Sequence, residues 1–155
     1  MKVEYKSFLD VRFWVNPDKG RHWQVLNPFV FEVDGVEYVV PVEFWTDFAS
    51  IPRILWNILD PYSLGYGPIP HDFGYFTGIK TQAYWDEVLN TCMIKDKIVW
   101  WKQESAFAAV RLFGDSVFQR YRRENAKHLS NSMFTKSLLT PICWTRGVPL
   151  NQFVV

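Results

Sequence analysis

The sequence predicts an α+β fold: a small N-terminal antiparallel β-sheet, then a helical, bundle-like half and an irregular C-terminal tail. In the first third, apolar, β-branched and aromatic runs alternate with turn residues. Beyond Thr46, apolar residues instead recur at every third or fourth position. A chain of 155 residues is long enough for one domain with a substantial core. We expect residues 1–127 to form this domain and residues 128–155 to form the tail.

The expected sheet consists of short apolar segments between turn residues. Val11–Val15 is rich in aromatic and β-branched residues, as strands are. Asn16–Gly20 is a turn cluster, because proline presets φ and glycine admits a positive φ. Asp34-Gly35 lies between two apolar runs, which is a strong hairpin signal. The other strands are expected at His22–Leu26, Phe29–Val33 and Val36–Val42.

Four helices are expected after Thr46. Ser50 and Thr81 are candidate N-caps, and Gly78 is a candidate end. The expected helices span residues 50–60, 71–78, 81–96 and 98–126.

Two features of these helices concern packing. The third expected helix has one apolar face with Asp86 at its edge, and this face consists of Trp85, Val88, Leu89 and Cys92. Gly114 lies in the middle of the last helix, where it either lets another element approach closely or weakens the helix.

Composition excludes several classes of protein. A net charge of +1 gives no reason to expect a nucleic acid partner. No apolar stretch approaches the roughly 20 residues that span a bilayer, and the N-terminus does not read as a signal peptide. Two cysteines do not make a disulfide framework, so we expect a reducing compartment. The tail is apolar, and it is expected to dock on its own domain, on another copy or on another protein.

Ile69–Tyr75 carries the residues most useful for chemistry. His71 and Tyr75 are four residues apart and share one helix face, whereas Asp72 is rotated by about 100° and faces elsewhere. Asp86 on the next helix can orient the imidazole, which leaves His71 as a general base toward a water molecule. Asp72 is then free to bind a cation or cap a neighbouring element. Alternatively, His71 and Asp72 satisfy buried backbone groups around the preceding loop.

A second polar cluster, Thr46–Ser50, lies where the sheet gives way to helices. Asp47 is a candidate partner of His71 or a ligand beside Asp72. Two or three oxygens with one imidazole suit a hard or borderline divalent cation, which is the candidate cofactor. Alternatively, Asp47 and Ser50 are turn and cap residues.

Several segments together resemble a family of small uncharacterised phage and prophage proteins, known as a domain of unknown function. They are Phe44–Arg53, His71-Asp72, Asp86 and Ala109–Gly114. The resemblance covers about residues 25 to 118, and Thr46–Pro52 is its most specific part. It implies a phage or prophage source, synthesis in the host cytoplasm and no established activity.

The stretch from His71 to Tyr75 also resembles the active-site helix of secreted phospholipases A2. This resemblance implies that His71 is the base, that Asp72 binds calcium and that Asp86 orients His71, with Tyr75 in support. The chain departs from that family, since it lacks the disulfides, the secretion signal and the glycine-rich calcium loop at the family's spacing.

Three functions follow as hypotheses. The first is a phage-encoded, hydrolase-like protein with His71 as base, Asp86 or Asp47 as its orienting residue and Asp72 as an ion ligand. The second is a non-catalytic virion component, such as a tail or baseplate protein, that associates with itself or a virion protein through its tail. The third is a protein that binds a host protein.

Overall fold

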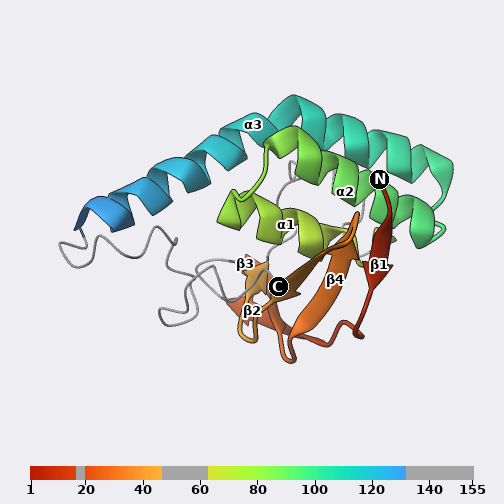
Figure 1. The fold of residues 1–155 in the computed structure, drawn as a ribbon, viewed down its shortest axis with the longest axis horizontal. Coiled ribbons are helices and arrows are strands. Elements are labelled where there is room, and N and C mark those ends of the chain that lie inside the picture. Colours follow the sequence, from red (N-terminus) through yellow and green to blue (C-terminus); the bar gives the residue numbers. More distant parts are fainter. Residues whose placement is uncertain (17–19, 47–62, 132–155) are drawn as a thin grey trace.

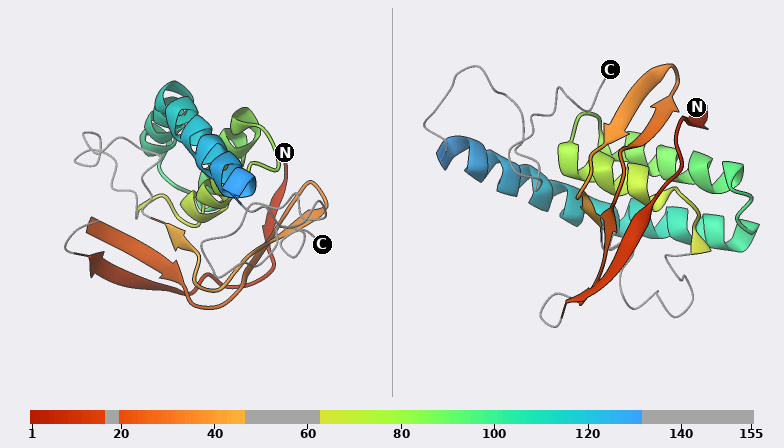
Figure 2. Two further views of the ribbon diagram at one scale, coloured as in Figure 1. Left: turned by 90° about the vertical axis from the view of Figure 1, so that its left-hand side faces the viewer. Right: turned by 90° about the horizontal axis from the view of Figure 1, so that it is seen from below.

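The computed structural model describes residues 1–16, 20–46 and 63–131. Within these ranges the strands lie on one side of the molecule and the three helices on the other (Figures 1 and 2). Strands precede helices in the chain, which confirms the α+β class. The expected helix at residues 50–60 and residues 132–155 of the expected tail lie outside the described residues. Residues 128–131, the expected start of the tail, instead continue the last helix.

In the described part of the chain, six strands form two antiparallel sheets of three strands each, in the orders β1-β4-β5 and β2-β3-β6. Their bounds are Val3–Tyr5 (β1), Val11–Asn16 (β2), Gly20–Val25 (β3), Phe29–Val33 (β4), Val36–Val40 (β5) and Trp45–Thr46 (β6). The prediction of a single sheet is therefore wrong, although its four strands are present. The sequence does not predict β1 and β6, because strands of three and two residues are too short to show a period.

The β4–β5 hairpin turns at the predicted Asp34-Gly35. Both residues have positive φ, 49° at Asp34 and 85° at Gly35, as a two-residue hairpin turn requires. The register pairs Phe31 with Tyr38, whose rings stack with centroids 5.3 Å apart. Both side chains are fully buried, so this sheet turns an aromatic face toward the helices.

The helices are α1 (Pro68–Thr77), α2 (Gln82–Lys95) and α3 (Trp100–Asn131). Thr81 caps α2 as predicted, accepting a hydrogen bond from the backbone N–H of Tyr84 at 3.3 Å. The predicted start of α1 at His71 is wrong by three residues. Pro68 and Pro70 belong to the first turn of α1, where a helix needs no N–H donor.

A glycine lets α1 and α2 approach closely. A Cβ at Gly74 of α1 would overlap the indole ring of Trp85 on α2. Trp85 is fully buried, and its ring meets Tyr38 of β5 edge-on with centroids 5.4 Å apart. Phe73 of α1 likewise meets Phe31 of β4 at 6.4 Å. Aromatic side chains thus join both helices to the first sheet, and the spacing of α1 and α2 depends on Gly74.

The outer helix α3 is tied to the end of α1 by an arginine. The Arg122 guanidinium donates hydrogen bonds to the carbonyl oxygens of Tyr75 and Phe76, at 2.7 and 2.6 Å. These carbonyls belong to the last turn of α1, which has no intrahelical donors for them. Burial lowers the pKa of Arg122. Arg122 thus acts as a positively charged cap that fixes α3 against α1.

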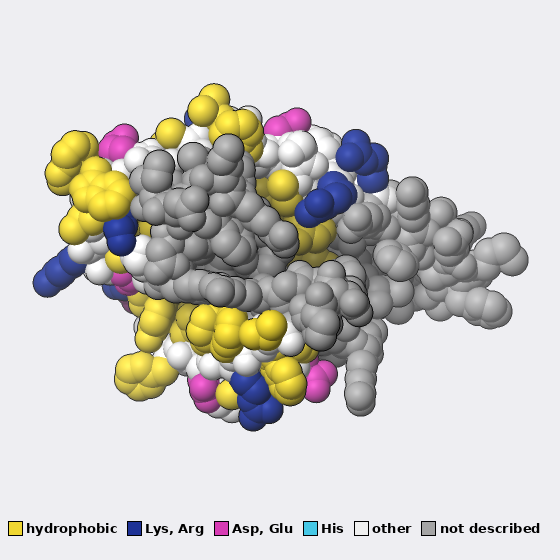
Figure 3. All heavy atoms as spheres, turned by 180° about the vertical axis from the view of Figure 1, so that it is seen from behind, with side chains coloured by type: hydrophobic (Ala, Val, Ile, Leu, Met, Phe, Trp, Pro, Cys, Tyr) yellow, Lys and Arg dark blue, Asp and Glu magenta, His cyan; other side chains and the backbone are white. Residues whose placement is uncertain are grey.

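Some aromatic and aliphatic side chains lie on the surface, where they gather in patches (Figure 3). The most exposed include Phe8, Trp100 and Leu112, at 89%, 75% and 75% of their full area. Within the described ranges, none of the three helices has the length and apolar character of a membrane span.

Candidate functional site

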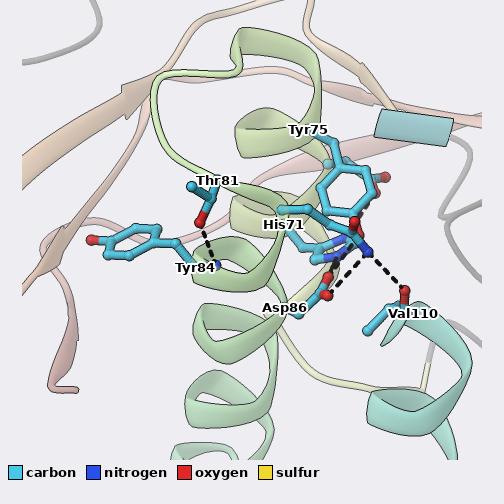
Figure 4. Close-up of polar contacts among 8 residues, drawn as sticks. His71, Tyr75, Thr81, Tyr84, Asp86 and Val110 are labelled. Atoms are coloured by element: carbon cyan, nitrogen blue, oxygen red, sulfur yellow. Dashed lines mark hydrogen bonds and ion pairs between the residues drawn. The ribbon is translucent and has the colours of Figure 1, made fainter. Parts of the chain in front are cut away.

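A buried carboxylate of α2 holds two side chains of α1 (Figure 4). Asp86 Oδ1 accepts hydrogen bonds from the Tyr75 hydroxyl at 2.6 Å and from His71 Nε2 at 3.1 Å. Asp86 is fully buried, and His71 is 1% exposed. Because a carboxylate only accepts, Nε2 carries a ring proton, and a neutral His71 has its lone pair on Nδ1. Asp86 therefore fixes both the orientation and the tautomer of the imidazole.

The other oxygen of this carboxylate faces α3. Gln82 Nε2 donates to Asp86 Oδ2 and to the carbonyl oxygen of Val110, each at 3.4 Å (Figure 4). Gln82 precedes Asp86 by one helical turn, so both side chains lie on the same face of α2. The backbone of α3 therefore belongs to the buried network around Asp86.

The opposite nitrogen of the imidazole faces Asp72. His71 Nδ1 lies 3.5 Å from Asp72 Oδ1, and the Asp72 side chain is 14% exposed. Asp72 Oδ2 accepts a hydrogen bond from the hydroxyl of Thr46, the last residue of β6. The imidazole is thus held between a sealed carboxylate and a second one at the edge of the buried network.

The charges around the ring determine its protonation. Burial of the imidazole lowers the pKa of His71, but the hydrogen bonds and negative charges of Asp72 and Asp86 outweigh this effect. The pKa of His71 is therefore raised above its ordinary value of 6.5. Burial, reinforced by the hydrogen bond to Asp86, also raises the pKa of the Tyr75 phenol. Tyr75 accordingly stays protonated and keeps donating to Asp86 at neutral pH.

The raised pKa predicts how stability depends on pH. A group whose pKa is higher in the folded protein stabilises the fold below its unfolded pKa, here 6.5, and this contribution is lost as pH rises through the folded value. We expect the free energy of unfolding to decrease as the pH rises above about 6.5, by about 1.4 kcal/mol per unit of pKa shift. Urea denaturation across this range measures it.

The control for this pH dependence is His71→Gln, which keeps a polar side chain but does not titrate. Subtracting its pH profile removes the contributions of all other titrating groups. Wild-type and His71→Gln profiles with the same slope would contradict the predicted ionisation of His71.

Three of the four predicted site residues, His71, Asp72 and Asp86, lie together in one cluster, whereas Asp47 lies outside the described residues. Asp86 is fully buried, which the sequence does not predict, and it accepts hydrogen bonds from α1 and from its own helix. One detail of the prediction is wrong. Asp72 does not face elsewhere, since its carboxylate bends back toward the imidazole.

Neither Gln82 as a member of the cluster nor Thr46 as a partner of Asp72 is predicted from the sequence. For Gln82 a signal is present, because it precedes Asp86 by four residues and could share its helix face. The hydroxyl of Thr46 reaches Asp72 only because β6 ends beside α1, and no local pattern indicates this contact.

A cation site is not complete among the described residues. They contain no group of three or more His, Cys, Asp or Glu side chains that could hold a metal ion. Around the outer carboxylate they supply Asp72 and the Thr46 hydroxyl, whereas Ca²⁺ takes roughly six to eight oxygen ligands. These residues do not fit a cation by themselves, so Asp72 as an ion ligand stays a prediction.

Fold and cluster define a small α+β protein whose helical half encloses a carboxylate–histidine–carboxylate arrangement. The sequence model of one family, described as "Protein of unknown function (DUF1353)", matches residues 23–110. The match covers more than half of the chain, and the chain therefore belongs to that family. The match includes His71, Asp72 and Asp86 and confirms the resemblance to a domain of unknown function. No curated protein and no solved structure matches the chain.

Proposed function

We propose that this chain is a hydrolase-like protein in which His71 acts as a general base through Nδ1. The observation that carries the proposal is the pairing of His71 Nε2 with the buried Asp86 at 3.1 Å. When His71 is neutral, at pH values above its raised pKa, this pairing leaves the lone pair on Nδ1, which faces the partly exposed Asp72. A base needs an oriented lone pair and a partner that stabilises its protonated form, and the pair of carboxylates meets the second need.

The reaction class that suits this arrangement is the hydrolysis of an ester. His71 Nδ1 would take a proton from a water molecule while the water oxygen adds to the acyl carbon. The bond between the acyl carbon and the ester oxygen would then break, and the imidazolium would give its proton to the departing alkoxide. The products are a carboxylic acid and an alcohol, and the base is regenerated. The same arrangement, with an aspartate on the next helix behind the histidine, is what the likeness to phospholipases A2 implies.

A water molecule that approaches Nδ1 of His71 must pass the side chain of Asp72. The imidazole is 1% exposed, whereas the Asp72 side chain is 14% exposed and bonded to Thr46. A water molecule therefore reaches Nδ1 when the Asp72 carboxylate turns away from the ring. No step of this proposal depends on a bound cation. The phage or prophage source implied by the resemblance of Thr46–Pro52 and the other matching segments is part of the same proposal.

The test is hydrolysis of a panel of chromogenic acyl esters and of phospholipid vesicles, each with added calcium or with a chelator. We expect His71→Ala to reduce the rate by roughly 100- to 10,000-fold, which is the usual contribution of a positioned base. A dependence on calcium would support Asp72 as an ion ligand, and Asp72→Asn should then abolish it.

A matched control separates catalysis from folding. His71→Gln can still donate to Asp86 but cannot act as a base near neutral pH, so it should fold and be inactive. If His71→Gln and the wild type hydrolyse the same ester equally well, His71 is not the base. If neither hydrolyses any member of the panel, the network stabilises the fold and the non-catalytic virion role becomes the better explanation.

A further inference from the structure

The backbone of α3 lies beside the side chains of α1 and α2 that form the candidate site. Gly114 lies opposite Tyr75, and a Cβ at this position would overlap the Tyr75 hydroxyl. The same Cβ would lie 3.2 Å from Tyr75 Cζ and 3.0 Å from Gln82 Nε2. Gly114 thus stands against the two side chains that, together with His71, hydrogen-bond Asp86.

A second contact shows that the approach of α3 is specific. Val110 precedes Gly114 by one helical turn, so both face the same side of the helix. The carbonyl oxygen of Val110 accepts a hydrogen bond from Gln82 Nε2 at 3.4 Å. The backbone of α3 therefore contacts the network at two successive turns. The carbonyl group of Val110 accepts a hydrogen bond, and Gly114, which has no side chain, lets the Tyr75 hydroxyl lie against the helix.

We propose that Gly114 is a positioning residue of the candidate site, whose missing side chain leaves the space in which the Tyr75 hydroxyl reaches Asp86. Tyr75 shares Asp86 Oδ1 with His71 Nε2, so a displaced hydroxyl changes the partner that orients the imidazole. The role of Gly114 in catalysis rests on the proposed function. The contact that it permits does not, and it can be measured without any substrate.

Helix propensity and steric overlap predict opposite effects of Gly114→Ala on stability. Alanine is a better helix former than glycine, and α3 continues for four turns beyond Gly114. If Gly114 were an incidental residue, Gly114→Ala would stabilise the protein. Steric overlap with a buried tyrosine instead makes the same substitution destabilising. The sign of the change therefore distinguishes a packing requirement from an incidental glycine.

The decisive experiment places Gly114→Ala in two backgrounds, wild type and Tyr75→Phe. In the wild type we expect the melting temperature to fall by roughly 5 °C or more. In Tyr75→Phe the overlapping oxygen is gone, and the contacts with Gln82 Nε2 at 3.0 Å and with Cζ at 3.2 Å remain, so the same alanine should cost much less or nothing. Ser116→Ala, an exposed change on α3, controls for the general effect of alanine on this helix.

A spectroscopic measurement tests the positioning role itself. His71 faces Asp72 and Tyr75 from α1 and Asp86 from α2, so its ring signals in NMR spectra report on these contacts. Removing the Tyr75 hydroxyl leaves Asp86 Oδ1 to the imidazole alone, so the His71 ring signals should shift in Tyr75→Phe. Gly114→Ala should shift the His71 ring signals in the same direction, whereas Ser116→Ala should leave them unchanged.

Each outcome decides the proposal. A destabilisation by Gly114→Ala that is much smaller or absent in Tyr75→Phe, with shifted His71 signals, supports it. If Gly114→Ala does not fold but the double variant does, the overlap with Tyr75 is likewise supported. Equal effects in both backgrounds, failure of both variants to fold, or unchanged His71 signals in a folded Gly114→Ala would overturn it. Because none of these measurements uses a substrate, the proposal can fail while the hydrolase-like function stands, and the reverse also holds.

Discussion

Replacing Asp86 with alanine is expected to lower the free energy of unfolding by about 3–5 kcal/mol, the range found when one partner of a buried ionic pair is removed. Asp86 is fully buried and accepts hydrogen bonds from His71, Tyr75 and Gln82. Alanine would leave these donors without their acceptor in a place that water does not reach. Denaturation in urea at neutral pH, with the melting temperature as a second measure, tests this expectation.

Two companion variants make this result interpretable. Asp86→Asn keeps the shape and an accepting oxygen but removes the charge, so its cost should be smaller than that of Asp86→Ala. Asp115→Ala removes an exposed carboxylate of α3 that accepts a hydrogen bond from Gln119 at 3.3 Å. Surface changes of this kind usually alter stability by no more than about 0.5 kcal/mol. If Asp86→Ala cost no more than Asp115→Ala, the buried network would not contribute to stability.

The sequence contains enough local information to place His71 and Tyr75 on one helix face and to name Asp86 of the next helix as a candidate partner. His71 and Tyr75 are four residues apart, and the cap at Thr81 sets the phase of α2 and so the side on which Asp86 lies. The hairpin at Asp34-Gly35 is predictable for the same reason, because its turn chemistry is contained in two adjacent residues. In each case a local rule fixes the result.

The burial of Asp86 could not be predicted in this way. On α2 alone it lies beside the apolar face of Trp85 and Leu89, and its burial depends on the packing of α1, which supplies His71 and Tyr75. The hydrogen bond between Thr46 and Asp72 likewise joins residues 26 positions apart. Helical periodicity describes one element at a time, whereas these contacts depend on how separate elements pack. The role of Gly114 is an intermediate case, since close approach was one of two alternatives that the sequence left open.

Gly74→Ala should have the second largest effect on stability, a loss of about 2–3 kcal/mol, as expected when a closely packed core is overfilled. The new methyl group would overlap the indole ring of Trp85, which is fully buried and packed against Tyr38. Alanine has a better helix propensity than glycine by about 1 kcal/mol, and the overlap must exceed this gain. Chemical denaturation of the variant and the wild type measures the difference.

A second glycine provides the matched control. Gly35→Ala meets no atom within 4 Å, but its φ of 85° is unfavourable for alanine. It should cost about 1–2 kcal/mol through backbone strain alone. A cost for Gly74→Ala at or below this value would mean that α1 and α2 are not closely packed at Trp85. Because their spacing also sets the 3.1 Å between His71 and Asp86, a destabilised Gly74→Ala should in addition shift the His71 ring signals. Gly35→Ala should leave these signals unchanged, since the β4–β5 turn lies outside the network.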